Sequence, residues 1–430
     1  MPAKQPRTLR TVTGAGGQPG VYELALDPKR STLDSAIRVA GLAEAAGFDA
    51  LFVPDLLRFG AQGAIGAQEP LLYVAALSQV TRDIGLIATV STTFHHPFNL
   101  ARMFGTLDHL SNGRAAWNLV TSSIGEENYS ADPLPSPPTR YARAAETLEI
   151  VHALWDSWQP GALTLGPDGR AVLDRSLIKP IDHLGEHFSV AGPLNIPPLP
   201  QRRPVLIQAG QSEEGISLGA RYAEIVFTSL PTLEIAREHT ARIRSQAAAL
   251  GRPDGLPLIF SSFHATYGAT EEEAQRLVRE RIAAIDYEQG RALLADMLGG
   301  TVDLSEAPLD QPLPHTLLPD IASINGRRGR VDIFSRHVRD GKTLRELIIA
   351  AQDTGHWSEA GTPYHLANAI EQRFRAGVLD VIMLNGLDDP RQHDLIVNGL
   401  LPELQERGIV APPGYQGGTL REALGLELAS

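Results

Sequence analysis

The residues best suited to chemistry lie in the run 205–215, which could hold a phosphate group. Residues 205–209 are mostly apolar and predict a buried strand, and a helical pattern follows Ser212 and runs to Tyr222. The first turn of a helix has unpaired backbone N–H groups and a partial positive charge, so it attracts anions. Gly210 permits close approach to the backbone, and the Ser212 hydroxyl can donate a hydrogen bond. A plain helix cap at Ser212 explains the same residues, and both interpretations stay open.

Polar side chains also stand at the ends of other predicted strands. Asp55 follows the second predicted strand, Thr89 lies in the third, Asn118 lies in the fourth and Gln211 follows the fifth. Together they supply amides, hydroxyls and one carboxylate, with no nucleophile beside a base. Such a lining suits a polar, planar cofactor better than acyl transfer.

Strands and helices must alternate to position these residues. Predicted strands occupy residues 9–13, 50–54, 84–93, 115–121, 205–209, 225–228, 258–267 and 381–385. Predicted helices occupy residues 33–46, 70–81, 100–110, 141–155, 215–222, 233–250, 271–287 and 362–376. Eight strand-then-helix units predict an α/β fold, a (β/α)8 barrel whose functional groups lie at the carboxyl ends of the strands. The alternative, an open doubly wound sheet, lacks a GxGxxG motif that leads from the first strand into a helix.

We expect a single barrel domain over residues 1–430 with three additions. Residues 159–203 and 298–361 break the alternation and are rich in Gly and Pro, so both are predicted insertions and the second is a candidate lid. Residues 402–430 are a C-terminal extension. No core-facing period is evident in the second insertion before Ile348. Its basic cluster is either a solvated run or an attraction site for an anion: Arg327, Arg328 and Arg330.

Composition excludes several function classes. The chain of 430 residues has a net charge of −12 and no long basic run, so nucleic-acid binding has no electrostatic basis. No uncharged apolar stretch of about 18 residues is present, and the N-terminus is polar and basic, so neither a membrane span nor a signal peptide is predicted. The absence of cysteine fits a reducing cytoplasm, and no His, Asp and Glu set has metal-ligand spacing. We therefore expect a cytoplasmic protein without a metal site.

Motifs over nearly the whole chain carry a resemblance to a known family. Two of them are Trp117-Asn118-Leu119-Val120-Thr121-Ser122 and Gln208-Ala209-Gly210-Gln211-Ser212. Others are the runs 46–55, 84–93, 101–114, 140–144, 154–158, 192–195, 308–314, 341–346, 402–408 and 419–422. The chain resembles the flavin-dependent monooxygenases of the bacterial-luciferase superfamily. Within it, the chain is similar to the branch of nitrilotriacetate, EDTA, dibenzothiophene-sulfone and pristinamycin monooxygenases.

The resemblance implies a (β/α)8 barrel that binds FMN. It implies these cofactor-binding residues: Asp55 and Thr89 near the ring system, Asn118 on the strand that faces it, Tyr141 and Ser212 at the phosphate, and Gly210 and Gln211 in the same turn as Ser212. The residues by themselves also allow Asp55 as a helix cap and Tyr141 as a core aromatic.

The resemblance further implies a two-component enzyme. A separate NAD(P)H:flavin reductase would supply reduced FMN, and O2 would oxygenate a small organic substrate, with C–N or C–S bond cleavage as one outcome. A homodimer or homotetramer is expected. Two alternatives remain, an F420-dependent oxidoreductase of the same superfamily and a non-catalytic flavin-binding protein.

One family position and three histidines need separate weighing. The family has a histidine four residues before its phosphate tyrosine, and this chain has Pro137 there, which puts one phosphate contact in doubt. His95 and His96 follow the third strand and are candidate catalytic residues, since histidine titrates near neutrality. A loop position without a catalytic role is the alternative for both. His315 lies in the candidate lid with its role open.

Overall fold

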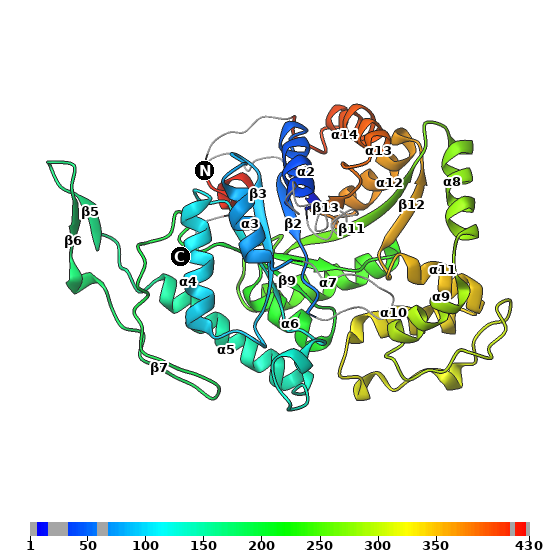
Figure 1. Cartoon of the computed structure of the whole chain (residues 1–430), viewed down its shortest axis with the longest axis horizontal. Helices are drawn as coiled ribbons and strands as arrows, with labels where there is room; N and C mark the ends of the chain where they lie inside the picture. The colour runs from blue at the N-terminus through cyan, green and yellow to red at the C-terminus, as the bar shows by residue number, and fades with distance from the viewer. Residues whose placement is uncertain (1–6, 16–32, 58–67, 413–417, 427–430) are drawn as a thin grey trace.

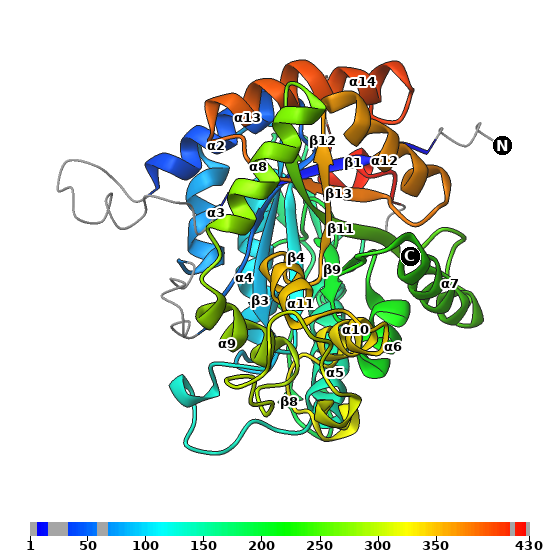
Figure 2. The ribbon, with the colours of Figure 1, turned by 90° about the vertical axis from the view of Figure 1, so that its right-hand side faces the viewer.

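The computed structural model describes residues 7–15, 33–57, 68–412 and 418–426. A closed barrel of parallel strands lies at its centre, with helices around it (Figures 1 and 2). The barrel strands are β1 (Arg10–Gly14), β2 (Ala50–Val53), β3 (Gly85–Ser91), β4 (Ala115–Val120), β9 (Val205–Ala209), β10 (Ile225–Thr228), β11 (Leu258–Tyr267) and β13 (Val381–Leu384). The predicted (β/α)8 barrel and all eight of its predicted strands are confirmed.

Parallel pairing around the full circle closes the barrel. β1 pairs with β2 and β13, and β11 pairs with β10 and β13. In the register of β3 and β4, Thr89 lies opposite Asn118, so two predicted site residues face each other across neighbouring strands. The outer half of β11 continues past the barrel and pairs with β12 (Trp357–Gly361), which sequence analysis did not predict.

Helices cover the outside of the barrel at the predicted places. They are α2 (Asp34–Ala45), α3 (Pro70–Ser78), α4 (Pro97–Leu110), α5 (Pro137–Trp155), α6 (Glu213–Tyr222), α7 (Leu233–Ala249), α8 (Glu271–Ala283) and α12 (Pro363–Arg375). α4 and α5 begin earlier than predicted because a proline suits the first helical position. The predicted helix 271–287 is wrong at its end: α8 stops at Ala283, and Asp286 caps a further helix, α9 (Tyr287–Met297).

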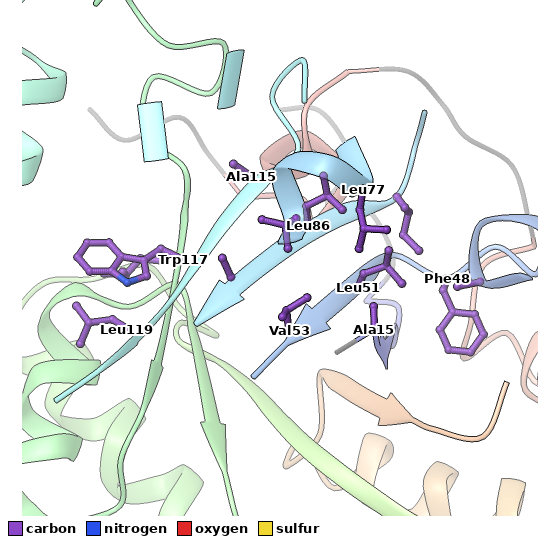
Figure 3. Close-up of a cluster of buried hydrophobic side chains, with 14 of the residues drawn as sticks. Ala15, Phe48, Leu51, Val53, Leu77, Leu86, Ala115, Trp117 and Leu119 are labelled. Carbon is purple, nitrogen blue, oxygen red and sulfur yellow. The ribbon is translucent and has the colours of Figure 1, made fainter. Parts of the chain in front are cut away.

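Alternation along the strands separates two cores. Leu86 and Trp117 point outward into the layer between barrel and helices, where Leu86 lies near Leu77 and Trp117 lies beside Leu119 (Figure 3). Ile87 points inward and packs with Phe260 inside the barrel. Side chains along a strand alternate with period two, so Thr89 faces inward like Ile87, and Asn118 faces inward like Ala116. Both lie nearer the carboxyl ends of their strands, at the open end of the barrel.

The insertion 159–203 contains two small antiparallel pairs. β5 (Leu163–Leu165) pairs with β6 (Ala171–Leu173), and β7 (His183–Leu184) pairs with β8 (Ser189–Val190). A short 3-10 turn, η2 (Arg175–Leu177), lies between the pairs. The first pair projects away from the barrel at the left of Figure 1. Its strand residues are all exposed.

The segment 298–361 contains more regular structure than the sequence analysis expects. Two 3-10 turns, η3 (His315–Leu317) and η4 (Ile321–Ser323), precede α10 (Arg328–Arg339), α11 (Leu344–Gln352) and β12. The expectation that no core-facing period precedes Ile348 is wrong. Val331, Phe334 and Val338 of α10 are buried at helical spacing and join a separate hydrophobic cluster with α9 and α11. The helical spacing of these buried residues was not recognised in the sequence because many basic residues lie between them. These three helices lie together at the lower right of Figure 1.

The C-terminal part returns to the barrel. Its elements are α13 (Pro390–Leu395), the π-helical turn η5 (Ile396–Leu400), α14 (Leu401–Glu406) and α15 (Leu420–Ala423). Leu420 and Leu424 of the α15 region pack with Val12 and Ile87 at the amino end of the barrel. No helix of the described residues is both long and apolar enough to cross a membrane.

Candidate functional site

A cavity of about 340 Å3 opens at the carboxyl ends of the barrel strands. All seven predicted cofactor-binding residues line it: Asp55, Thr89, Asn118, Tyr141, Gly210, Gln211 and Ser212. They come from the ends of β2, β3, β4 and β9 and from the first turns of α5 and α6. The structure therefore brings together residues that lie more than 150 positions apart in the chain, and their individual binding roles remain predictions.

One wall of the cavity is a polar pair on β3 and β4. Asn118 Nδ2 donates a hydrogen bond to Thr89 Oγ1 at 3.0 Å, and both side chains are almost fully buried. Asn118 Oδ1 is buried without a hydrogen-bond partner among the described residues, and the Thr89 hydroxyl keeps a proton to donate. The pair thus presents one acceptor and one donor to the cavity.

A second wall is the turn between β9 and α6. Ser212 is the N-cap of α6, because Gly215 N donates to Ser212 Oγ at 3.2 Å. The helix cap weighed in the sequence analysis is therefore present, and it leaves the hydroxyl proton free for a ligand. Tyr141 reaches this turn from α5: an alanine Cβ at Gly210 would lie 2.8 Å from its hydroxyl. A glycine is required at 210 for the tyrosine to approach.

Pro137 also lines the cavity, at the first position of α5, where the family has histidine. Its ring cannot donate a hydrogen bond. Three residues along, Arg140 lines the same wall and donates to Pro135 O at 2.5 Å and to Asn325 Oδ1 at 2.7 Å. Burial lowers the pKa of Arg140. Sequence reasoning missed this arginine because it weighed only its neighbour Tyr141 in the motif.

Asp55 supplies the carboxylate of the cavity. Burial raises its pKa to about 6, the nearby Glu69 adds to the rise, and His95 and the Leu56 backbone oppose it. Asp55 caps none of the described helices; the cap of the next helix, α3, is Glu69, which accepts from Leu72 N. A carboxyl with this pKa can exchange a proton near neutral pH.

The candidate catalytic histidines do not line the cavity. His95 Nδ1 donates to Ser91 O at 2.9 Å, which anchors the loop after β3. His96 is the N-cap of α4 and accepts from Phe98 N, with its ring edge-on to Phe188. Both geometries fit structural positions, and a catalytic role for either residue stays a prediction. Within the described chain, no cluster of three or more His, Asp or Glu side chains could hold a metal ion.

Other parts of the lining come from residues outside the predicted cofactor-binding set. β10 contributes Phe227, Thr228 and Ser229 at its carboxyl end. The start of α10 contributes the run 326–330, which includes the basic cluster of the candidate lid. The polar residues at the carboxyl end of β10 could have indicated this part of the lining, but no local pattern indicated where α10 would pack.

The unpartnered polar atoms around this cavity fit a flavin. Asn118 Oδ1, Thr228 Oγ1 and Arg330 Nη1 are buried and have no hydrogen-bond partner within the described part of the chain. Buried polar groups without partners are costly, so a ligand with matching donors and acceptors would stabilise this arrangement. A flavin carries carbonyl and N–H groups on its ring and hydroxyls and a phosphate on its chain.

Fold and site together place the chain among the cofactor-dependent (β/α)8 barrel enzymes. The family model described as luciferase-like monooxygenase matches residues 10–333. The chain belongs to the luciferase-like monooxygenase family.

Three similar proteins make this assignment more specific. The N-acetyl-S-(2-succino)cysteine monooxygenase of Bacillus subtilis (strain 168) is 39% identical over 402 residues, which cover 92% of this chain and 90% of the relative. Component A of nitrilotriacetate monooxygenase from Aminobacter aminovorans is 37% identical, with coverage of 83% and 79%. A solved riboflavin lyase with modified FMN and riboflavin superposes with a TM-score of 0.82 at 28% identity, covering 98% of this chain and 97% of that one.

These findings confirm the resemblance to the nitrilotriacetate monooxygenase branch. The chain is a flavin-dependent monooxygenase of the two-component type that acts on a small organic substrate. Neither alternative, an F420-dependent oxidoreductase or a non-catalytic flavin-binding protein, is favoured by them.

Proposed function

We propose that the flavin is FMN, bound reduced in the cavity at the carboxyl end of the barrel. The observation that carries the proposal is the convergence of Thr89, Asn118, Tyr141 and Ser212 on one cavity. The related riboflavin lyase, whose structure holds a modified FMN, supports FMN as the flavin. When bound, the flavin supplies the electron transfer to O2, and the protein supplies orientation and a dry site.

The chain's own residues then divide the work of binding. The N–H groups at the start of α6 and the hydroxyls of Ser212 and Tyr141 bind the phosphate. The Thr89–Asn118 pair hydrogen-bonds the ring. The start of α10 covers the cavity and keeps water from the reacting groups, which prevents loss of reduced flavin to unproductive oxidation.

A separate NAD(P)H:flavin reductase supplies the reduced FMN in this proposal. The designation of the Aminobacter relative as component A supports a partner protein. No Gly-rich dinucleotide motif leads into a helix after the first strand of this chain. We place the system in the cytoplasm, where reduced pyridine nucleotides are available.

The substrate in this proposal is a small molecule with a C–S or C–N bond next to the carbon that is oxygenated. The Bacillus relative is named for a thioether, N-acetyl-S-(2-succino)cysteine, and the Aminobacter relative is named for a tertiary amine, nitrilotriacetate. Both names support this substrate class. One oxygen atom of O2 enters the substrate, the other leaves as water, and reduced FMN provides the two electrons.

The test couples the purified chain to a generic flavin reductase with NADH, FMN and O2. N-acetyl-S-(2-succino)cysteine, nitrilotriacetate and dimethyl sulfide are supplied in turn, and products are identified by mass spectrometry with 18O2. We expect 18O in a product of one substrate only when chain and reductase are both present. NADH oxidation by the chain alone, or the absence of FMN binding, would refute the proposal.

The same proposal includes a homodimer or homotetramer. The exposed apolar side chains of the two small strand pairs support it, because exposed apolar patches mark contact surfaces. Leu165 is 79% exposed and Leu184 is 85% exposed. Light scattering after size-exclusion chromatography measures the oligomer, and a monomer at micromolar concentration would contradict this part.

A further inference from the structure

The start of α10 brings three arginines to the edge of the cavity, and their environments differ. Arg328 is neutralised: its Nη1 lies 3.2 Å from Glu214 Oε1, and its Nε donates to Ile324 O at 2.7 Å. Arg327 is exposed to solvent. Arg330 lines the cavity and forms no ion pair with any described residue.

Arg330 is partly buried and has one N–H group without a partner among the described residues. Its Nη2 lies 3.3 Å from His356 Nε2, and its Nη1 is buried with no hydrogen-bond partner among the described residues. Burial and the neighbouring Arg327 lower its pKa to about 10 and Asp296 opposes this shift, so the guanidinium still carries its charge at neutral pH. A partly buried cation with an unpartnered Nη1 gains stability when an anion binds beside it.

His356 orients this guanidinium without cancelling its charge. Burial lowers the pKa of His356 to about 2, with further contributions from Arg330 and His264, so the imidazole is neutral. Because its Nε2 faces a guanidinium, which only donates, the ring proton lies on Nδ1, 3.3 Å from Ser229 Oγ. The ring is held by contacts with Phe227 and His264 at centroid distances of 5.6 and 5.4 Å.

Ser229 ties this group to the cavity turn. Gln211 Nε2 donates to Ser229 O at 2.7 Å, and Ser229 N donates to Gln211 Oε1 at 3.3 Å. The chain of contacts from Gln211 through Ser229 and His356 to Arg330 contains no carboxylate. The neutral partners of Arg330 therefore position its positive charge in a cavity lining that also contains Arg140.

We propose that Arg330 binds an anionic group of the substrate, a carboxylate or sulfonate, and selects anionic substrates over neutral ones. The inference rests on the proposed function in one respect, namely that the cavity also takes the substrate. A cofactor phosphate is the competing anion. Tyr141 and Ser212 lie on α5 and at the β9–α6 turn, whereas Arg330 contacts His356, which precedes β12. Gln211 and Ser229 connect the two groups, so FMN affinity has to be measured beside substrate affinity.

Equilibrium binding to the FMN-loaded protein tests this inference without requiring turnover. The probes are N-acetyl-S-(2-succino)cysteine and nitrilotriacetate, each compared with its uncharged amide by isothermal titration calorimetry. The variants are Arg330→Gln and Arg330→Lys. Arg339→Gln is the matched control, because Arg339 is exposed at the other end of α10.

We expect at least one acid to bind the wild type more tightly than its amide. Arg330→Gln should weaken that acid about ten- to hundredfold, as loss of a charge-assisted hydrogen bond does, and remove the preference over the amide. Arg330→Lys should retain part of the preference because the charge remains, and Arg339→Gln should stay within about twofold. FMN affinity should change little in all three.

Three results would overturn the inference. One is equal binding of acids and amides to the wild type, and another is an unchanged preference in Arg330→Gln. The third is a loss of FMN affinity with unchanged riboflavin affinity in Arg330→Gln, which would assign Arg330 to the cofactor phosphate. All three are separate from the proposed function, which depends on FMN binding and on 18O incorporation.

Discussion

At the scale of single residues, Ser212 shows how one hydroxyl can serve both fold and ligand. Its oxygen accepts the Gly215 N–H at the start of α6, and its proton remains available. The helix-cap and phosphate interpretations of this serine are therefore compatible, because they use different parts of the same group. The Tyr141 hydroxyl lies close to Gly210 and Gly215 and forms no hydrogen bond with a side chain or backbone group of the described residues.

The first prediction follows from this pair. Ser212→Ala and Tyr141→Phe should each weaken FMN binding about ten- to hundredfold, since a hydrogen bond to a charged group contributes about 1.5–3 kcal/mol. Fluorescence titration measures the affinity, and riboflavin, which lacks the phosphate, is the control ligand. Unchanged FMN affinity in both variants would disprove the phosphate assignment.

The second prediction concerns the carboxyl group of Asp55. Its pKa is about 6 in the fold against 3.8 in an unfolded chain, chiefly because of burial. The folded state then holds a proton that the unfolded state has released, so this residue lowers stability as pH rises from about 4 to 6. Asp55→Asn should therefore gain stability relative to the wild type across that window and show a constant difference above it.

Urea unfolding at several values between pH 4 and pH 8 measures this difference. Asp174→Asn is a suitable control, because Asp174 is fully exposed and its pKa is lowered by Ser176 rather than raised. Parallel stability profiles for Asp55→Asn and the wild type would show that the carboxyl is not buried in solution.

Residue types at strand ends and the family resemblance predicted seven residues of the cavity lining. Thr89 and Asn118 were predicted from the family resemblance, and the register of β3 and β4 places them opposite each other. Arg330 was predictable as an anion site only as one of two options. Its guanidinium contacts His356, which in turn contacts Ser229. Neither residue could be connected with Arg330 from the sequence, because both lie far from it along the chain.

At the scale of elements, the β9–α6 turn depends on the absence of a side chain at Gly210. A Cβ there would lie 2.6 Å from Gln208 Nε2 and 2.8 Å from the Tyr141 hydroxyl. The third prediction is that Gly210→Ala weakens FMN binding at least tenfold by displacing Tyr141. Gly41→Ala on α2 is the control: no described atom would lie within 4 Å of its Cβ, and it should add about 0.5–1 kcal/mol of stability without changing FMN affinity.

The fourth prediction tests the candidate lid. Residues 326–330 line the cavity, so a ligand in the cavity should restrain the start of α10. Trypsin should cleave after Arg327 in the free protein and more slowly with FMN bound. Arg170, whose side chain is 88% exposed in the β5–β6 turn, is an internal control whose cleavage FMN should not slow. Equal rates at Arg327 in both states would make the segment a fixed insertion.

The elements also show where sequence patterns fail. The barrel strands were predictable because buried parallel strands are continuous apolar runs. α10 was not, because its buried apolar residues lie among arginines that bind neighbours outside the local pattern, such as Arg336 with Glu238. β12 was not, because Trp357-Ser358-Glu359-Ala360-Gly361 has no strand-like alternation and forms only by pairing with β11.

At the scale of the whole molecule, the carboxyl end of the barrel is open and polar, whereas its amino end is closed by apolar side chains. The carboxyl end holds a polar cavity beneath α10. The amino end is filled by α15, which lies more than 300 residues from β3 in sequence. Leu420 N donates to Gly113 O, and the Leu420 side chain packs directly against Gly85 at the start of β3. Arg421 N donates to Gln201 Oε1, and Arg421 forms a buried ion pair with Glu224.

The fifth prediction separates stability from function by means of this end. Leu420 is 4% exposed, so Leu420→Ala should lower the free energy of unfolding by roughly 2–5 kcal/mol through lost burial and a residual cavity. Leu250→Ala is the control at a leucine that is 56% exposed and should change it by no more than about 0.5 kcal/mol. Urea unfolding measures both. FMN affinity of the folded Leu420→Ala protein should equal that of the wild type, because the cavity lies at the other end of the strands. A large loss of FMN affinity together with intact stability would show instead that α15 shapes the cavity through the barrel interior.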